Sequence, residues 1–181
     1  MLMSKYFLLG VGVVTALMII MIVGAILSGN KGGEKNDCFR LYLHLTNTTK
    51  EVNTYQDYLK SSDLRASNSS LKGILTNTNN DLKEYLTAKY KFKDKDIDKD
   101  IVEEATLQYD ALHSELAEAK INGILDRVYA HKMTYEISVL MAEEAKIVNS
   151  TSNDTLKNFL TTSYNSLNTL YSQFNDFSET K

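Results

Sequence analysis

Apolar side chains recur at steps of three and four residues along most of this 181-residue chain. This step places them on one face of an α-helix, whereas a half-buried strand alternates apolar and polar residues. No proline interrupts the pattern, and proline is the residue that most strongly breaks a helix interior. The sequence therefore predicts an all-α fold. In the first predicted helix, at about 35–61, the apolar face consists of Leu41, Leu45, Thr48, Val52, Tyr55 and Leu59.

Three further segments repeat this pattern, at about 67–92, 97–148 and 153–177. The segment 97–148 contains a turn signal, Asn122-Gly123, so it forms either one long helix or two helices. Because the apolar pattern continues on both sides of Gly123 without a cluster of helix breakers, one kinked helix is favoured. Helices of about 25 residues with short connections pack as antiparallel neighbours. The chain is therefore predicted to form an antiparallel four- to five-helix bundle over 37–178.

Polar residues at the predicted boundaries suggest where the helices begin. Ser67, Asn68 or Ser69 is expected to cap the second helix, because their side chains accept hydrogen bonds from free backbone N–H groups. The polar stretch NSTSND at 149–154 is expected to form a loop that supplies the cap of the last helix.

Residues 6–28, near the N-terminus, form a run without any charged residue. As a helix rising roughly 1.5 Å per residue, this run spans about 35 Å, and the hydrocarbon core of a bilayer is about 30 Å thick. The run is also longer than the apolar region of most cleaved signal peptides. It therefore predicts an uncleaved transmembrane anchor in contact with the lipid bilayer, and a cleaved signal is the alternative.

This anchor determines the expected organisation of the chain. Residues 1–5 would form a short cytoplasmic tail, 6–28 the anchor, 29–36 a flexible spacer and 37–178 the bundle. The Lys and Arg residues flanking the run do not decide its orientation, but a short N-terminal tail readily stays in the cytoplasm. We therefore expect a single-pass plasma-membrane protein with an extracytoplasmic bundle. A cytoplasmic bundle tethered by its N-terminus is the alternative.

The charge balance argues against nucleic-acid binding. The net charge is −3 and the pI is ≈ 5.6, whereas a nucleic-acid binder carries a basic stripe. The run KYKFKDKDIDKD at 89–100 does set aromatic residues among lysines, as in a site that stacks bases and binds phosphate. Its four aspartates would repel phosphate. We therefore interpret this run as a solvated connection between helices and expect no nucleic-acid partner.

The three histidines, His44, His113 and His131, do not form a recognisable metal or catalytic motif. Helical bundles that bind two metals use two Glu-x-x-His pairs, and the nearest spacing here joins Asp110 to His113. A single metal held by this pair would need a third ligand that the sequence does not identify. We therefore predict no metal site, no cofactor and no catalytic residue, and hence no enzyme.

Cys38 is the single cysteine, so it cannot form a disulfide within the chain. We interpret it as a half-buried thiol near the start of the first helix, and a disulfide between two chains is the alternative. His44 follows six residues later, which places the two side chains about 120° apart around a helix. A thiol–imidazole nucleophile is therefore not expected. Most of the 11 tyrosines fall on apolar stripes and are expected to be core or boundary aromatics.

These observations favour one function over two others. The leading hypothesis is a membrane-anchored, non-catalytic helical bundle that acts as an interaction or structural module at the cell envelope, binding another protein or itself. The first alternative is an extracytoplasmic bundle that senses a small molecule. The second is a ferritin-like bundle that binds metal, which the shortage of ligands disfavours.

Overall fold

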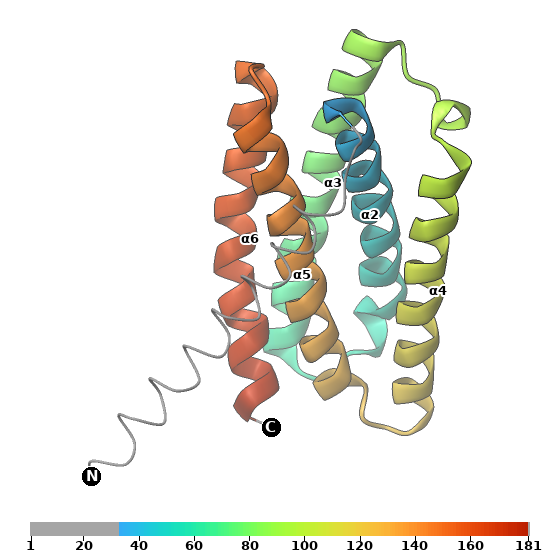
Figure 1. The fold of residues 1–181 in the computed structure, drawn as a ribbon. Coiled ribbons are helices and arrows are strands. Elements are labelled where there is room, and N and C mark those ends of the chain that lie inside the picture. The colour runs from blue at the N-terminus through green and yellow to red at the C-terminus, as the bar shows by residue number, and fades with distance from the viewer. Residues whose placement is uncertain (1–32, 181) are drawn as a thin grey trace, which may run out of the picture. The chain divides into compact units, whose positions relative to one another are not determined.

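The computed structural model describes residues 33–180, which form five α-helices and no strand. The helices are α2 (Glu34–Tyr55), α3 (Ser62–Tyr90), α4 (Lys99–Ile121), α5 (Leu125–Ser150) and α6 (Asp154–Thr180), with 3₁₀ turns at Gln56–Tyr58 and Asp94–Asp96. Successive helices run in opposite directions (Figure 1). The prediction of an all-α antiparallel bundle is confirmed for this part of the chain.

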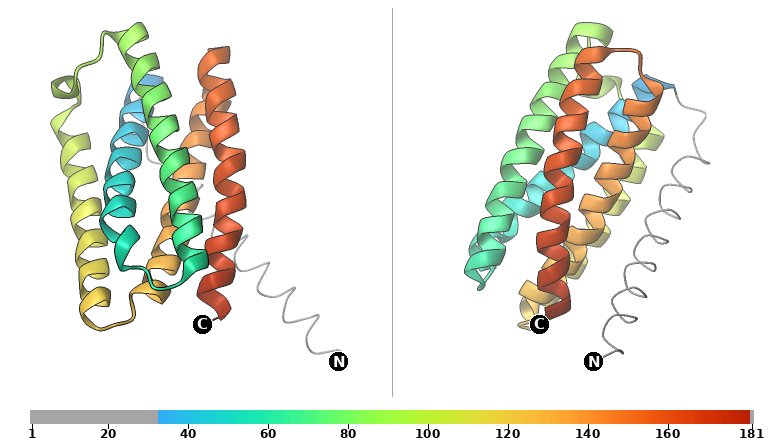
Figure 2. Two further views of the ribbon diagram at one scale, coloured as in Figure 1. Left: turned by 180° about the vertical axis from the view of Figure 1, so that it is seen from behind. Right: turned by 90° about the vertical axis from the view of Figure 1, so that its left-hand side faces the viewer.

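Four of the helices, α2, α3, α5 and α6, surround the main core, and α4 packs on the outside against α2 and α5 (Figures 1 and 2). The predicted apolar stripes supply this core. All six residues of the first predicted stripe, five on α2 and Leu59 just after it, are at most 2 % exposed, and so are Leu71, Leu75 and Leu82 of α3 and Leu156, Leu160 and Leu167 of α6. Burying one such leucine stabilises a fold by roughly 1.5–3 kcal/mol.

Of the two possibilities for 97–148, the favoured single kinked helix is wrong and the alternative of two helices is confirmed, because the chain turns at Gly123. This glycine has a φ of 72°, a left-handed conformation that costs a residue with a Cβ atom roughly 1–2 kcal/mol. The N–H of Gly123 donates to the carbonyl of Lys120 (3.2 Å), and the N–H of Ile124 donates to the carbonyl of Ala119 (3.0 Å). This pair of bonds is the Schellman motif, which ends α4 and sets α5 antiparallel to it.

The predicted cap of α3 is also corrected. Ser61 is the N-cap, and its hydroxyl accepts a bond from the N–H of Leu64, whereas the predicted caps at 67–69 lie inside the helix. Asp126 stabilises the connection before α3, because its carboxylate accepts bonds from the N–H groups of Lys60 and Ser61. The first predicted helix accordingly ends at Tyr55 rather than near 61.

The predicted loop at 149–154 does supply the cap of α6. The Oδ1 atom of Asn153 accepts a bond of 2.9 Å from the N–H of Leu156. This bond satisfies one of the N–H groups that the first turn of a helix leaves free.

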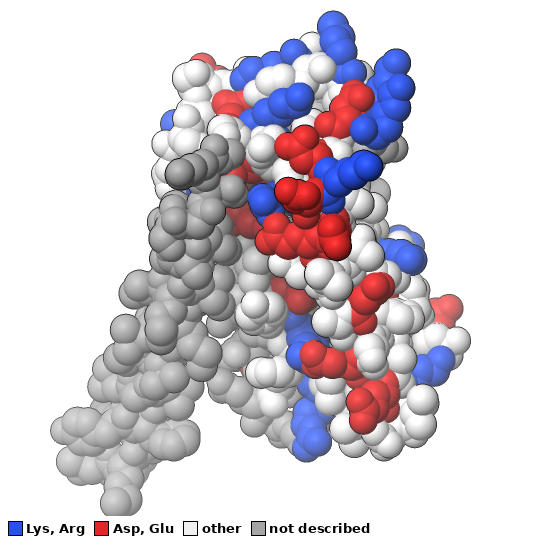
Figure 3. Space-filling view, turned by 45° about the vertical axis from the view of Figure 1, so that its right-hand side comes forward, with Lys and Arg blue, Asp and Glu red and all other residues white. Residues whose placement is uncertain are grey.

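The connection from α3 to α4 begins with a left-handed residue, Lys91 (φ 56°). The next residue, Phe92, is buried against Phe39 and Tyr42, with ring centroids 5.3 Å and 5.2 Å apart. Phe92 therefore belongs to the core and is not exposed for base stacking. On the side of the molecule that carries α4, basic side chains gather near this connection and acidic side chains form a band beside them (Figure 3).

The predicted location as a single-pass plasma-membrane protein needs correction. Within residues 33–180, no helix combines the length and apolar character needed to cross a bilayer. The predicted tail at 1–5, the anchor at 6–28 and the first half of the spacer, 29–32, lie outside the described residues. Residues 34–36 of that spacer form the first turn of α2, so the bundle begins earlier than expected.

Candidate functional site

A row of polar side chains on α2 faces α4 and α5. Its members follow one another at steps of four, three and four residues, which places them on one helix face. They are Arg40, His44, Asn47 and Glu51. Three of them contact α4: Arg40 pairs with Glu104, the amide of Asn47 donates to the carbonyl of Ala105 (3.2 Å), and Glu51 pairs with His113. We call this set of contacts the polar seam.

His44 is the member of the seam that contacts α5. Its Nε2 atom lies 2.8 Å from Oε2 of Glu136, and its Nδ1 atom lies 2.9 Å from Oε2 of Glu143. Burial lowers the pKa of His44, but the charge of Glu143 and the hydrogen bonds to both glutamates outweigh burial and raise the pKa to about 10. Both ring nitrogens therefore carry a proton at neutral pH. The ring serves as a cation between two carboxylates, with no nitrogen left for a metal or for accepting a proton.

Glu51 and His113 form another polar contact of the seam. The Nδ1 atom of His113 lies 3.1 Å from Oε1 of Glu51, whose side chain is fully buried. The ring of Tyr109 stacks on His113 at 5.8 Å, and Lys50 lies over the other aromatic ring of this stack, 4.3 Å from the centroid of Tyr109. This arrangement holds α4 against α2 through charge and aromatic contacts.

The remaining candidate residues from the sequence do not form a reactive site. His113 pairs with Glu51, not with Asp110, and His131 is exposed. In the part of the chain that the structure describes, no three His, Cys, Asp or Glu side chains are placed to hold a metal ion. Cys38 is fully buried rather than half-buried. Burial, together with the charges of Glu34 and Asp37, raises the pKa of its thiol to about 12, so it stays protonated.

A buried carboxyl group lies in the core between α3, α5 and α6. The Oε1 atom of Glu144 accepts a bond of 2.6 Å from Ser163, whose hydroxyl accepts one of 2.8 Å from Thr78. The other oxygen, Oε2, is buried without a hydrogen-bond partner. Burial raises the pKa of Glu144 to about 8. The group is therefore mostly protonated at neutral pH and links three helices as a neutral acid.

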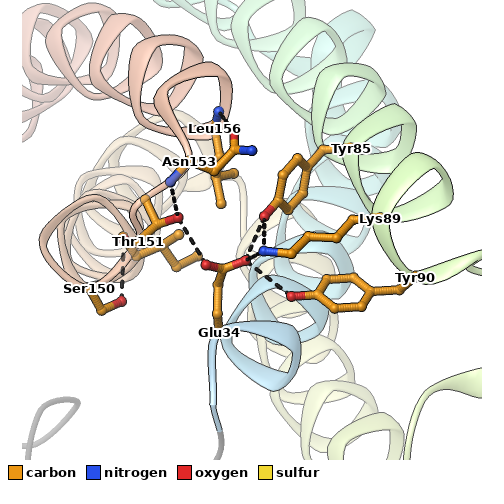
Figure 4. A network of polar contacts seen from close by, with 9 residues as sticks. Glu34, Tyr85, Lys89, Tyr90, Ser150, Thr151, Asn153 and Leu156 are labelled. Carbon is orange, nitrogen blue, oxygen red and sulfur yellow. Dashed lines mark hydrogen bonds and ion pairs between the residues drawn. The ribbon is translucent and has the colours of Figure 1, made fainter.

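Glu34 lies at the start of α2 and holds together the end of the bundle where α3 finishes and α5 connects to α6 (Figure 4). Its Oε1 atom accepts bonds from Tyr85 (2.5 Å), Lys89 (2.6 Å) and Tyr90 (3.1 Å), and its Oε2 atom accepts one from Thr151 (2.9 Å). One carboxylate thus joins α2, the end of α3 and the connection between α5 and α6.

The outward side of α4 carries exposed apolar residues among acidic ones. Leu107 is 66 % exposed and Ile121 is 85 % exposed. Glu103 and Asp110, also exposed, lie on the same stripe, because steps of four, three and eleven residues keep side chains within about 60° around a helix. We call Glu103, Leu107, Asp110 and Ile121 the outer face of α4.

A hollow of about 480 Å³ lies at the end of the bundle where α4 turns into α5. The C-terminal end of α6 lies at this same end (Figure 1). Six side chains give it an apolar floor and a basic rim: Tyr58, Ile124, Phe177, Lys60, Lys120 and Arg127. The carboxylate of Asp126 also lines it but is bonded to backbone N–H groups. We call this the end hollow.

Comparison with known proteins found none similar to this chain. No protein-family model, curated protein or solved structure matches the chain.

Sequence reasoning missed the seam and the outer face, although both had a signal. The seam residues on α2 each precede a residue of the apolar stripe, for example His44 before Leu45 and Glu51 before Val52. A polar row beside an apolar row indicates a helix that contacts two different neighbours. Leu107 and Ile121 are 14 residues apart and lie off the stripe that the buried Leu112, Leu116 and Ala119 form on α4, which indicates an outward apolar face.

Proposed function

We propose that this chain is a non-catalytic helical module that acts by binding another protein chain through the outer face of α4 and the end hollow. The observation that carries the proposal is the exposure of Leu107 and Ile121 on one stripe of a single helix. Exposed apolar side chains scattered singly need no explanation, but apolar residues aligned on one face and rimmed by charge are typical of interaction sites.

The state of the ionisable groups supports a non-catalytic role. A general base must be able to accept a proton near neutral pH, and His44 is already protonated between two carboxylates. A thiol nucleophile must form a thiolate, and Cys38 is buried with a raised pKa. Glu144 has a perturbed pKa but lies in the core, 0 % exposed. These groups stabilise helix packing.

Site-specific photocrosslinking tests the proposal. A benzophenone amino acid replaces Leu107, Ile121 or, as the control, Thr76, which is exposed on α3. In the cells that naturally make the chain, we expect a discrete protein adduct at positions 107 and 121 and none at 76, and mass spectrometry then identifies it. The same adducts at all three positions, or none at either α4 position, would refute the proposal.

A second candidate function, the sensing of a small molecule, has one supporting observation. A groove of about 750 Å³ between α3 and α6 is lined by two aromatic rings, Tyr85 and Phe159, and two carboxylates, Asp81 and Glu84. Lys89 also lines it, but its charge is paired with Glu34. Aromatic faces and carboxylates together bind organic cations. Screening small organic amines by thermal shift tests this function. A ligand that stabilises the native chain but not the Phe159→Ala and Asp81→Asn variants would support it, and absence of any such ligand would count against it.

A further inference from the structure

The outer face of α4 and the end hollow have opposite charge. On the outer face, Leu107 is flanked by the acidic residues Glu103 and Asp110. In the end hollow, Lys60 and Arg127 are exposed at the rim of an apolar floor. Each surface thus has the apolar centre and charged rim of a small binding site, and the two rims attract each other.

We propose that the end hollow of one chain binds the outer face of a second copy of the same chain, in a head-to-tail arrangement. This inference rests on the proposed function and names the partner. Leu107 of one copy supplies the apolar side chain that covers Tyr58 and Ile124 of the next. Glu103 and Asp110 then face the basic rim, which fixes the orientation.

The two surfaces belong to different copies because of their separation. Leu107 and Ile121 are 14 residues apart on one helix, about 21 Å at 1.5 Å per residue. Because the helix is rigid, Leu107 cannot reach the end hollow of its own chain, which lies beyond the C-terminal end of α4.

The charge pattern also selects the symmetry. A twofold pair of outer faces would place Glu103 and Asp110 of one copy against the same acidic residues of the other, and like charges across an interface cost energy. Contacts between two different surfaces avoid this repulsion. They generate chains or rings rather than closed dimers.

A charge-swap experiment on the full chain tests this arrangement. The hollow variant carries Lys60→Glu and Arg127→Glu, and the face variant carries Glu103→Lys and Asp110→Lys. Sedimentation velocity is measured from about 10 µM to about 1 mM, a range that suits a small and therefore weak interface. We expect the native chain to assemble as its concentration rises. Each variant alone should assemble at least tenfold more weakly, because its face and its hollow then carry the same sign.

The equimolar mixture of the two variants is the decisive sample. The basic face of one variant then meets the acidic hollow of the other, and the unchanged face meets the unchanged hollow. Assembly should therefore return to within about threefold of the native strength. Circular dichroism checks that both variants are folded, and the milder pair Lys60→Gln and Arg127→Gln replaces the hollow variant if it is not; its own loss of assembly is then the readout.

Three other outcomes overturn the inference. A native chain that stays monomeric refutes it, although a crosslink from position 107 to a different protein would leave the proposed function standing. A native chain whose assembly is unaffected by either variant associates through other surfaces. A mixture that remains as weak as its components shows that these two surfaces do not meet.

Discussion

The Nδ1 atom of His44 lies 2.9 Å from the carboxylate of Glu143, and its other ring nitrogen is bound by Glu136, about two turns earlier on the same helix. This contact makes the attachment of α2 to α5 depend on the charge of one imidazole. The folded-state pKa of His44 is raised from 6.5 to about 10. A raised pKa means that the folded state holds the proton more tightly than the unfolded state.

The first prediction concerns this histidine. Its contribution to stability is fully present below pH 6.5 and is lost as the pH rises through about 10. His44→Gln should lower the free energy of unfolding at pH 6 by roughly 2–4 kcal/mol, because it leaves two partly buried carboxylates without their cation. Urea unfolding between pH 6 and pH 10 measures this. His131→Gln, at an exposed site on the same helix as the glutamates, should change stability by about 0.5 kcal/mol or less.

The second prediction concerns Glu144. Burial raises its folded-state pKa from 4.5 to about 8. The stability that this group contributes is therefore fully present below pH 4.5 and is lost as the pH rises through about 8. Glu144→Gln removes the ionisable group and keeps an oxygen for Ser163. The variant should therefore gain stability relative to the native chain as the pH rises from 5 to 9, by on the order of several kcal/mol. A stability difference that does not change with pH would contradict the assignment.

The sequence predicted the packing of the bundle well because apolar periodicity is local information. Leu45, Leu75 and Leu160 are buried where their spacing placed them. Gly123 was misjudged for a different reason. Its neighbours on both sides are compatible with a helix, and the turn depends on a left-handed φ and two backbone bonds that apolar periodicity does not report.

The polar contacts could not be predicted in the same way because they join distant parts of the chain. Glu34 and Thr151 are 117 residues apart, and His44 and Glu143 are 99 apart. Periodicity assigns each residue to a face of its own helix, but it does not say which face of which other helix lies opposite. The outer face of α4 could have been predicted, since Leu107 lies off the apolar stripe that contains Leu112 and Leu116.

The third prediction concerns the Glu34 network. Partial burial raises the pKa of Glu34, but hydrogen bonds from Lys89, Tyr85, Thr151 and Tyr90 outweigh it and lower the pKa from 4.5 to about 2. The stability that this carboxylate provides is therefore present above pH 4.5 and is lost as the pH falls towards 2. Glu34→Gln should lower the free energy of unfolding at pH 7 by roughly 1–3 kcal/mol.

Acid unfolding distinguishes this role from a general loss of negative charge. The stability of the Glu34→Gln variant should depend less on pH between 4.5 and 2 than the stability of the native chain does. Glu84→Gln, at an exposed position on α3, should retain the native pH dependence. If both variants respond alike, the network does not hold this end of the bundle together.

The fourth prediction compares the two left-handed residues that end α3 and α4. Gly123 (φ 72°) has open space around the position of a Cβ atom, so Gly123→Ala introduces backbone strain without a steric clash. It should destabilise the chain by about 1 kcal/mol. Lys91 (φ 56°) already bears that strain, and Lys91→Gly should relieve it and stabilise the chain by up to about 1 kcal/mol. Thermal unfolding of the two variants should thus shift in opposite directions, and a shift in the same direction would show that the helix ends are held by side-chain contacts instead of backbone conformation.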